Sequence, residues 1–494
     1  MIKKYSIGSE NLTLRSDIAA SEPVYVYFSK EQNKLLYSKF LVELLDSPEV
    51  KKPLKVSDEG ISFLLQSGVV PPPKTVYQDV YILGIGDEAK VSDDNGKITI
   101  EFSFNFPFLN FIRKESDDYD VSYSKIQELL LNATLKDLDA SKETFIFHSA
   151  GKDSNPLVIA IAEAGLQDKF TLVTHKTKRK EDESSVSSAI AKVLGFKHIV
   201  LNEVDQLCTS HIEEVNKLFK KAPLPCTNNI SILYPLYVAQ LPALQNSNIV
   251  DGSGSDIYIG HVPGETEFKR QKLAKYFSHF KILGECLAST NRIYSLTKTR
   301  AELTGLNGFS AHDSRKLFRR HTDISSYWRN VENFDDYLDF RASVRGRVID
   351  TELFMRKARN FCDAFGNNMV FPWTDQKVVE HFMYMPERYL IDRKGLRNKL
   401  LLREMLKDKL DVDSDEVGKR GYPYDLRSML VNNHAYIVET ITDCKLWNSE
   451  RGAQFIQELS SNSTKGGRVG LVSSSLLYQL FMISGWHNRC RWLH

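Results

Sequence analysis

The chain has 494 residues, of which 42% are hydrophobic and 26% charged, so it is long enough for about two or three folded domains and too apolar to be mostly disordered. Lys and Arg number 65 and Asp and Glu 63, so the net charge is 65 − 63 = +2, which excludes a general electrostatic attraction to nucleic acid or anionic membranes. Because no run of about 18 apolar residues is present and polar sequence follows the opening MIKK directly, we expect neither a membrane-spanning helix nor a signal peptide.

The six cysteines lie far apart in the sequence, and no two of them form a CxxC pair. This spacing favours neither a zinc site nor a disulfide framework. It indicates a protein of the reducing cytoplasm.

Residues 1–115 alternate short β-type runs with turns and look like a small α+β module. Residues 23–28 and 97–102 are rich in β-branched and aromatic side chains, which predicts strands, and the DNG sequence at 94–96 predicts a tight turn before the second strand. Residues 61–68 are typical of a short helix that ends at a glycine.

A charged stretch at residues 113–120 links this module to a second domain, residues 116–494. Strands that alternate with helices there predict a parallel sheet with helices on both faces, and in such sheets ligands bind at the carboxyl ends of the strands. The predicted strands are residues 144–148, 170–174, 197–201 and 248–251, and the predicted helices are 123–138, 156–164 and 184–194.

From about residue 268 onward the pattern is helical, and we expect no strand there. The sequence SSNSTKGGRVG at residues 460–470 predicts a flexible loop by its composition.

The strand at 144–148 is followed directly by a loop of small and polar residues, HSAGKDSN at 148–155, which opens a helix. Small residues let backbone N–H groups approach an anion, and the helix N-terminus adds donors and a favourable dipole. Ser149 and Ser154 can donate to phosphate oxygens, whereas the carboxylate of Asp153 needs a bridging cation, which indicates Mg²⁺ between Asp153 and a polyphosphate. The loop does not match the Walker pattern, and the alternative is an ordinary turn capped by Ser and Asp.

A second small-residue turn, DGSGSD at residues 251–256, follows another predicted strand. Because both turns lie at the ends of sheet strands, Asp153 and Asp256 can face one Mg²⁺–pyrophosphate from two sides. The alternative is a glycine-rich loop with a helix cap at Ser255 or Asp256.

Together these turns resemble the synthetase domain of the asparagine synthetase B family, within the PP-loop ATP pyrophosphatases. SAGKDS at 149–154 matches the family's SGGxDS with one Gly→Ala departure, and DGSGSDI at 251–257 is similar to its SGEGSDE. Further elements follow in the family's order: the PFLD-like FPWTDQ at 371–376, VVEHFMYMP at 378–386, the KxxLRE match KLLLRE at 399–404 and the KxGF-like KRGY at 419–422.

The stretch from Tyr25 to about Phe104 resembles only the latter half of the glutamine amidohydrolase domain found in complete members of the family. In those proteins a cysteine after Met1 is the nucleophile, whereas here position 2 is Ile2 and the first cysteine is Cys208. We therefore expect residues 1–115 to be a truncated remnant of this Ntn-type domain, without glutaminase activity, that serves as a scaffold or recruitment surface.

The resemblance implies an α/β PP-loop fold with a helical C-terminal part, and an enzyme that activates carboxylates. A substrate carboxylate attacks the α-phosphorus of ATP, Mg²⁺–pyrophosphate leaves, and an amine converts the acyl-adenylate into an amide and AMP. Asp153 and Asp256 would bind Mg²⁺, and Lys419 would stabilise charge at the α-phosphate or the tetrahedral intermediate. The residues that would bind ATP and pyrophosphate, with adenine against backbone groups, are His148, Ser149, Ala150, Gly151, Lys152, Asp153, Ser154, Val173, Thr174 and Gly252.

One departure affects the second half-reaction. The catalytic position between the two glycines, where the family has a carboxylate or a tyrosine, holds Ser253, which is no general base near neutral pH without a partner. Either another residue takes the proton, the amine arrives neutral, or this half-reaction is changed. The downstream candidates for another base are Glu265, Glu267 and His261.

We expect an ATP-dependent amide synthetase that joins a small-molecule or peptide carboxylate to an amine or ammonia in specialised metabolite, peptide or sugar modification. β-Lactam synthetases and lasso-peptide cyclases are similar, and a separate protein that supplies ammonia or delivers substrate is compatible with this reading. Two alternatives remain: a non-catalytic nucleotide-binding scaffold, favoured by Ser253 and Ile257, and a tRNA-modifying PP-loop enzyme, favoured by SAGKDS. Against the latter stands the neutral net charge.

Overall fold

The computed structural model describes residues 1–108, 113, 119–179, 182–277, 280–331, 336–417, 424–447 and 449–494. The predicted boundary after residue 115 lies outside the described residues. So do Lys419 and the rest of the KRGY turn at 419–422.

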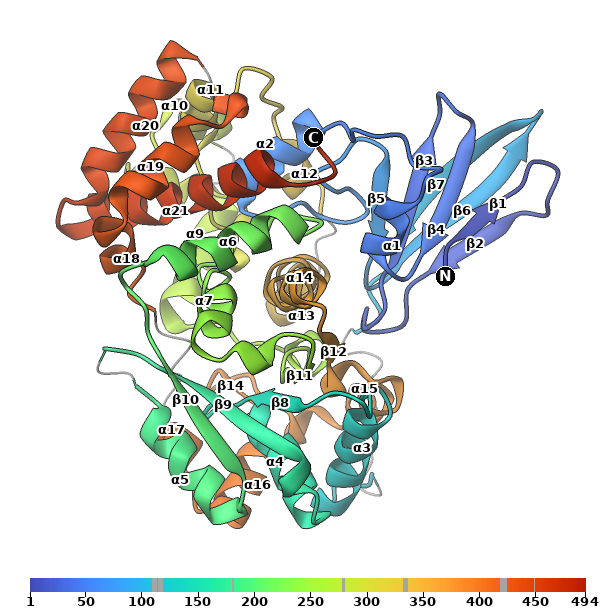
Figure 1. Cartoon of the computed structure of the whole chain (residues 1–494), viewed down its shortest axis with the longest axis vertical. Helices are drawn as coiled ribbons and strands as arrows, with labels where there is room; N and C mark the ends of the chain where they lie inside the picture. Colours follow the sequence, from blue (N-terminus) through green and yellow to red (C-terminus); the bar gives the residue numbers. More distant parts are fainter. Residues whose placement is uncertain are drawn as a thin grey trace.

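The first hundred residues form two antiparallel sheets, ordered β1-β4-β3-β5 and β2-β6-β7 (Figure 1). The β6–β7 turn is the predicted one, with Asn95 and Gly96 at φ 52° and 82°, as a two-residue hairpin turn requires. The elements are β1 (Lys3–Tyr5), β2 (Leu12–Arg15), β3 (Val24–Ser29), β4 (Lys34–Ser38), α1 (Leu41–Asp46), α2 (Asp58–Ser67), β5 (Val80–Leu83), β6 (Asp87–Asp94) and β7 (Lys97–Phe104).

Strand β3 is buried on both faces, because its alternating side chains pack into two different cores. Val26 and Phe28 lie between the two sheets, whereas Tyr25 and Tyr27 face the rest of the protein. There the Tyr25 hydroxyl accepts a hydrogen bond from Arg356 at 3.2 Å. The N-terminal sheets are therefore packed against the remainder of the chain.

A five-stranded parallel sheet forms the centre of the second part, in the order β10-β9-β8-β11-β12. The chain runs from β8 through β9 to β10 and then returns to place β11 on the other side of β8. The loops after β8 and β11 therefore diverge at this switch point and leave a crevice between them. The strands are β8 (Thr144–Phe147), β9 (Phe170–Lys176), β10 (Lys197–Asn202), β11 (Asn248–Val250) and β12 (Asn368–Val370).

Helices cover both faces of this sheet, as the sequence predicted, with α3, α4 and α5 on one face and α6 and α7 on the other (Figure 1). The predicted helix at 184–194 ends at Gly195 with φ 79°, a left-handed conformation that favours glycine. The helices are α3 (Tyr123–Leu135), α4 (Ser154–Glu163), η2 (Gln167–Lys169), α5 (Ser184–Leu194), α6 (Thr209–Lys221), α7 (Leu233–Gln240), η3 (Pro242–Leu244) and α8 (Asp256–Ile259).

The expectation of no strand after residue 268 is wrong. Strand β12 completes the central sheet beside β11, and β13 pairs with β14 in a small hairpin. These strands are β12, of three residues, and β13 (Ile391–Asp392) and β14 (Arg397–Asn398), of two each. Runs this short are too brief for a period-two pattern to appear in the sequence.

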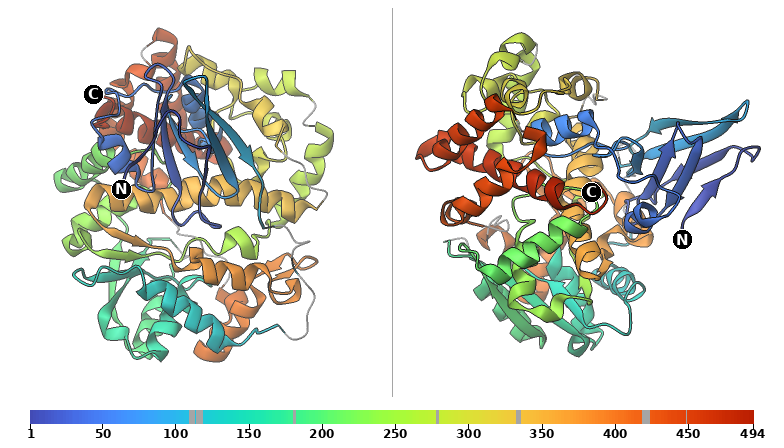
Figure 2. Two further views of the ribbon diagram at one scale, coloured as in Figure 1. Left: turned by 90° about the vertical axis from the view of Figure 1, so that its right-hand side faces the viewer. Right: turned by 45° about the horizontal axis from the view of Figure 1, so that its top comes forward.

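The remaining chain is helical, and one continuous helix of three segments, α13, η6 and α14, crosses the molecule beside the N-terminal sheets (Figure 2). Its middle segment is wound as a π-helix, a rare form that is often found at functional sites. The helices are α9 (Glu265–Phe277), α10 (Lys281–Cys286), η4 (Ile293–Leu296), η5 (Glu302–Thr304), α11 (Ala311–Leu317), α12 (Ser325–Arg329), α13 (Tyr337–Val344), η6 (Arg345–Met355), α14 (Arg356–Phe365), η7 (Pro372–Thr374), α15 (Gln376–Met383), η8 (Glu387–Tyr389), α16 (Leu400–Leu410), α17 (Ser414–Val417), α18 (Leu426–Asn432), α19 (His434–Thr442), η9 (Lys445–Trp447), α20 (Glu450–Ser463) and α21 (Gly467–Arg489).

The predicted flexible loop at 460–470 is also wrong, because α20 and α21 take up most of it. Ser463 is 3% exposed, and its hydroxyl donates to the carbonyl of Ser460 within the helix at 2.6 Å. The two helices pack against each other, and this tertiary packing outweighs the low helix propensity of Ser and Gly.

Helix α21 is the one described helix that is long and apolar enough to cross a membrane, with a mean hydropathy of 1.3 over its most apolar window. However, 78% of that window is buried. The helix packs against α6, α18, α19 and α20, which is the environment of a core helix.

Candidate active site

A cavity of about 240 Å³ lies at the switch point of the parallel sheet. We call it the nucleotide cavity. It lies where a doubly wound sheet is expected to bind its ligand. Its walls come from the loops after β8 and β11, from α7 and from the long helix. Its polar lining residues are Ser149, Asp153, Ser154, Tyr234, Tyr237, Asp251, Ser253, Ser255, Asp256, Asp350 and Lys357.

The loop after β8 is held in shape by its own side chains. Asn155 donates to the carbonyls of Ser149 and Gly151 at 3.2 and 2.7 Å, and Ser154 donates to the Ser149 carbonyl at 3.1 Å. Asp153 lies at the N-cap position of α4, but its side chain accepts no capping hydrogen bond. An ordinary capped turn is therefore a poor description of this loop, and the carboxylate of Asp153 points elsewhere.

The loop after β11 lies directly against the first loop. A Cβ atom on Gly252 would lie 3.2 Å from backbone atoms of Asp153 and Ser154, a tighter contact than most Cβ atoms make, so glycine favours this close approach. Gly254 has φ 114°, and Ser255 donates its hydroxyl to Asp153. The second loop therefore brings Asp256 to the same place as Asp153.

The PFLD-like segment supports both loops. The indole of Trp373 donates to the Asp153 carbonyl at 2.8 Å, and the Tyr258 hydroxyl donates to the Trp373 carbonyl at 2.7 Å. Trp373 is fully buried, so this segment fixes the position of Asp153 by packing as well as by hydrogen bonding.

Lys399 joins the two carboxylates, and sequence reasoning did not select it as a site residue. Its ammonium contacts Asp153 and lies 2.7 Å from Asp256 Oδ1, while its side chain is only 4% exposed. Burial alone would lower the pKa of Lys399, but the charges of Asp153 and Asp256 outweigh it and raise this pKa. The available signal was its place as the first residue of the KxxLRE match.

The two carboxylates fit a hard divalent cation. Both have oxygens on one Lys399 nitrogen, so they are close enough for one ion to bridge them. The described residues contain no cluster of three or more His, Cys, Asp or Glu side chains that could hold a metal. At nucleotide sites Mg²⁺ is usually held by one or two carboxylates, and phosphate oxygens and water fill its remaining coordination positions.

Several residues that the sequence placed at the ATP site do not line this cavity: His148, Ala150, Gly151, Lys152, Val173 and Thr174. The backbone N–H of His148 donates to the Val173 carbonyl at 2.9 Å, and the Thr174 hydroxyl donates to the His148 carbonyl at 3.0 Å. The N–H of Ala150 donates to Glu183 at 3.0 Å. His148, Ala150, Val173 and Thr174 are therefore tied into the sheet edge by these bonds. The predicted residues that line the cavity together are Ser149, Asp153, Ser154, Gly252, Ser253 and Asp256.

His148 is buried and supports the loop. Because it is held neutral there, we expect the free energy of unfolding to fall in acid. Burial lowers its pKa to about 4 from 6.5, and its Nε2–H donates to Asn155 Oδ1 at 2.9 Å, since the Asn155 amide nitrogen is itself a donor. The unfolded chain takes up this proton below about pH 6.5 and the folded chain only near pH 4, so stability falls across that window. At pH 5 this group costs about 2 kcal/mol relative to pH 7.

Between pH 7 and pH 5 we expect the free energy of unfolding, measured with urea, to fall less in His148→Asn than in the wild type. The difference between the two losses should be about 2 kcal/mol. His487, whose pKa burial also lowers to about 4, is present in both proteins and cancels. Equal acid sensitivity of the two proteins would show that His148 is not held neutral.

The three residues suggested as substitutes for a carboxylate at Ser253 do not line the nucleotide cavity. Glu267 makes a bidentate ion pair with the buried Arg341 at 2.7 and 3.1 Å, and Arg341 also lies 2.6 Å from His261 Nδ1. Glu265 is 77% exposed and paired with Lys269. Glu265 and Glu267 are therefore engaged elsewhere, whereas His261 Nε2 lies 3.9 Å from Asp256 Oδ2 at the edge of the site.

Four carboxylates share the cavity with Ser253, namely Asp153, Asp251, Asp256 and Asp350, and of these Asp350 comes from the π-helical segment. Its Oδ1 lies 3.2 Å from Arg345, but its Oδ2 is buried with no hydrogen-bond partner among the described residues. Burial raises the pKa of Asp350, and the nearby Arg345 guanidinium counteracts this. Nothing in the local sequence marks this residue, because it is 97 positions from Ser253 (350 − 253) and only the fold brings the two together.

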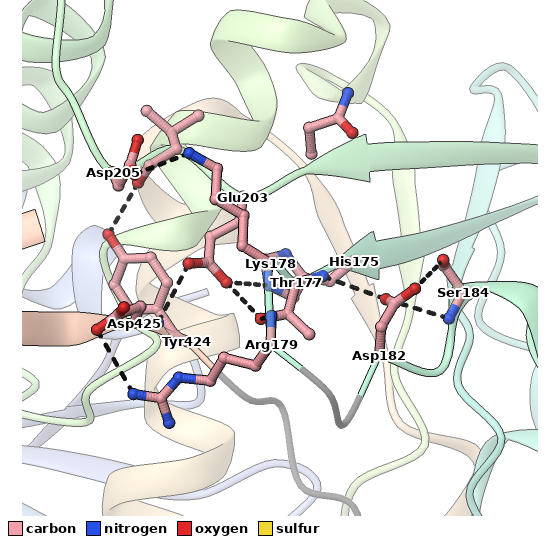
Figure 3. Close-up of polar contacts among 12 residues, drawn as sticks. His175, Thr177, Lys178, Arg179, Asp182, Ser184, Glu203, Asp205, Tyr424 and Asp425 are labelled. Atoms are coloured by element: carbon pink, nitrogen blue, oxygen red, sulfur yellow. Dashed lines mark hydrogen bonds and ion pairs between the residues drawn. The ribbon is translucent and has the colours of Figure 1, made fainter. Parts of the chain in front are cut away.

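A polar network at the carboxyl ends of β9 and β10 holds the chain that follows the KRGY turn (Figure 3). Glu203, whose side chain is fully buried, accepts hydrogen bonds from Thr177 at 2.6 Å and from the backbone of Asp425 at 3.3 Å. The Tyr424 hydroxyl donates to the Val204 carbonyl at 3.1 Å, and Arg179 lies 3.5 Å from Asp425. Tyr424 and Asp425 therefore lie against the same sheet edge that carries the nucleotide cavity.

A comparison with models of known families finds one match, described as asparagine synthase, over residues 125–487. This range is more than half of the chain and contains both loops, the PFLD-like segment and Lys399. A comparison with curated proteins finds no match.

Proposed function

This chain belongs to the asparagine synthase family, whose members carry out ATP-dependent amide synthesis, and on that premise we propose that it is an AMP-forming carboxylate–amine ligase. It converts a carboxylic acid and ATP into an acyl-adenylate and pyrophosphate, and then an amine and the acyl-adenylate into an amide and AMP.

The observation that carries this proposal is the meeting of Asp153 and Asp256 at the switch point. Two carboxylates face one position beside the N-terminus of α4, in a crevice between two loops of small residues. Carboxylates beside a phosphate site are unfavourable unless a cation lies between them, so the arrangement suits a Mg²⁺-bound polyphosphate. Mg²⁺ held by Asp153 and Asp256 would neutralise the charge of the leaving pyrophosphate.

The chain's own residues have separate tasks in the two half-reactions. Ser149, Ser154 and the N-terminus of α4 bind the pyrophosphate, and Lys399 supplies a positive charge beside it. In the second step the amine nitrogen forms a bond to the acyl carbon, the bond from that carbon to the AMP oxygen breaks, and the nitrogen loses a proton. We assign that proton to the unpartnered Oδ2 of Asp350, in place of a base at position 253. Lys419 would stabilise charge in the tetrahedral intermediate.

The nitrogen donor in this proposal is an amine, or ammonia from outside residues 1–115. That stretch contains no cysteine and therefore no thiolate for glutamine hydrolysis. We propose that it is a remnant of an amidohydrolase domain that now acts as a packing scaffold, in a protein of the reducing cytoplasm. Its docking on the long helix through Tyr25 and Arg356 supports a scaffold role.

The proposal is tested by identifying the nucleotide product. The protein is incubated with Mg–ATP, hydroxylamine as the amine, and pools of carboxylic acids and peptides, and the nucleotides are separated by anion exchange. We expect AMP and pyrophosphate, formed only when an acid is present. ADP and phosphate would contradict the proposal, and nucleotide binding without any turnover would favour a non-catalytic scaffold, to which Ser253 also points.

Lys399 gives a separate expectation, because its buried ammonium compensates two carboxylates, 36% and 31% exposed, when no metal is bound. Lys399→Met leaves Asp153 and Asp256 facing each other without a counter-charge, and because both are about one third exposed this should cost about 1 to 2 kcal/mol of stability, less than for a buried pair. Added Mg²⁺ should restore the melting temperature of the variant more than it raises that of the wild type, because the ion replaces the ammonium. A variant that is destabilised but unaffected by Mg²⁺ would argue against a metal between these carboxylates.

A further inference from the structure

A second and larger cavity, of about 920 Å³, adjoins the nucleotide cavity. Phe354 lines both, so the two cavities meet at this side chain. We call the second one the arginine cavity, after Arg179, Arg427 and Arg468 in its wall. The remaining walls come from α18, from the N-terminal turns of α21, from residues 227–229 and from Leu353 in the long helix.

The size of the arginine cavity exceeds what a single amino acid needs. Its volume is almost four times the 240 Å³ of the nucleotide cavity (920/240). Cavities of about 300 to 1,000 Å³ hold ligands of drug size, and this one lies near the top of that range. A site for ammonia or a free amino acid would not require this space.

The charge of the arginine cavity suits an anion. Three arginines face one carboxylate, Asp425, which pairs with Arg179 at 3.5 Å. Arg468 has a buried Nε without a hydrogen-bond partner among the residues that the structure describes. Arg427 donates to the carbonyls of Thr464 and Lys465, just before α21, at 2.7 and 2.8 Å. Gly467 and Arg468 place the N-terminus of this 23-residue helix in the same wall, where its dipole favours negative charge.

The rest of the wall is both apolar and rich in amides. Leu471 is 72% exposed although it lines the cavity, so an apolar group bound there would cover it. The wall also contains side-chain amides and hydroxyls, groups that can pair with the peptide groups of a ligand: Asn228, Asn229, Asn307, Ser474 and Ser475.

We propose that the arginine cavity binds the carboxylate substrate of the ligase, and that this substrate is an acidic peptide of a few residues. A side-chain carboxylate of the peptide pairs with Arg468 and Arg427 near the start of α21, an apolar residue covers Leu471, and the reacting carboxylate passes Phe354 into the nucleotide cavity. This inference rests on the proposed function, and it adds the class of substrate to it.

The first test is ATP–pyrophosphate exchange with two pools, one of free amino acids and simple carboxylic acids, the other of three- to six-residue peptides containing Asp or Glu. We expect exchange with the peptide pool at least ten times faster than with the first pool, and at least a tenfold loss in Arg468→Gln. The matched control Arg451→Gln, an exposed arginine on α20 outside the cavity, should retain wild-type exchange. Calorimetric binding of Mg–AMPCPP should be unchanged in both variants.

Exchange that is equally fast with free amino acids, or unaffected in Arg468→Gln, would overturn the substrate class while the ligase proposal stands. Exchange with neither pool would also overturn the proposed substrate class. If the wild-type protein did not bind Mg–AMPCPP at all, the ligase proposal itself would be wrong.

A second test uses anilinonaphthalene sulfonate, an amphipathic anion that fits the cavity. We expect one saturable site whose Kd rises at least tenfold in Arg468→Gln and in Leu471→Asp, an exposed position that tolerates a charge. Wild-type affinity in both variants would overturn the proposal.

Discussion

Asp153→Asn should lower ATP–pyrophosphate exchange by at least about 100-fold, a loss typical of removing one electrostatic contact to the transferring group. The variant removes one of two carboxylates that face the metal position and leaves Lys399 with Asp256 alone. Weaker Mg–AMPCPP binding in calorimetry should accompany the loss. The fold should persist, because the side chain caps no helix and Trp373 binds the main-chain carbonyl of Asp153.

Asp168→Asn is the matched control for this prediction. Asp168 is an exposed aspartate in η2, on the chain between α4 and β9, and it lines neither cavity. Exchange should be unchanged in this variant. If Asp153→Asn exchanged pyrophosphate at the wild-type rate, the carboxylate would not act on the nucleotide. The loop would then be better interpreted as an ordinary turn.

Asp350→Asn is expected to separate the two half-reactions. The amide keeps the shape of the side chain but accepts no proton, so amide formation should fall by about 100-fold or more. Adenylation, measured as pyrophosphate exchange, should stay within a few-fold of the wild type, because no proton is transferred in that step. The rate of hydroxamate formation from hydroxylamine measures the second step.

The comparison variant for Asp350 is Glu265→Gln. Glu265 was a candidate base from the sequence, but it is 77% exposed and lies outside the nucleotide cavity, so both half-reactions should be unchanged. If Asp350→Asn lost exchange and amide formation equally, Asp350 would support the structure of the cavity and would not be the base. If Glu265→Gln lost only amide formation, the assignment would pass to Glu265.

Local sequence patterns predicted much of the central sheet and both loops. The strand at 144–148, the helix at 184–194 and the turn at 94–96 each depend on neighbouring residues, such as the glycines at φ 79° and 82° that end or turn the chain. The loops after β8 and β11 were found for the same reason, since glycine, serine and aspartate stand next to each other in the sequence.

The features that sequence reasoning missed depend on contacts between distant residues. Lys399 is 246 positions from Asp153, and Asp350 reaches the cavity only because the long helix crosses the sheet edge. The helices that replaced the predicted loop at 460–470 are stabilised by packing, which outweighs local propensity. The arginine cavity likewise collects its cations from three separate segments, at residues 179, 427 and 468.

The measurement that tests the central claim most directly is incorporation of labelled pyrophosphate into ATP by the wild-type protein, with and without carboxylic acids or peptides. The claim is that the cavity at the switch point activates a carboxylate at the α-phosphorus of ATP. It predicts label in ATP that requires both Mg²⁺ and an acid and that disappears in Asp153→Asn. No label in ATP with any acid, while Mg–AMPCPP binds normally, would contradict the claim. So would a protein that incorporates labelled phosphate into ATP in the presence of ADP but does not incorporate labelled pyrophosphate.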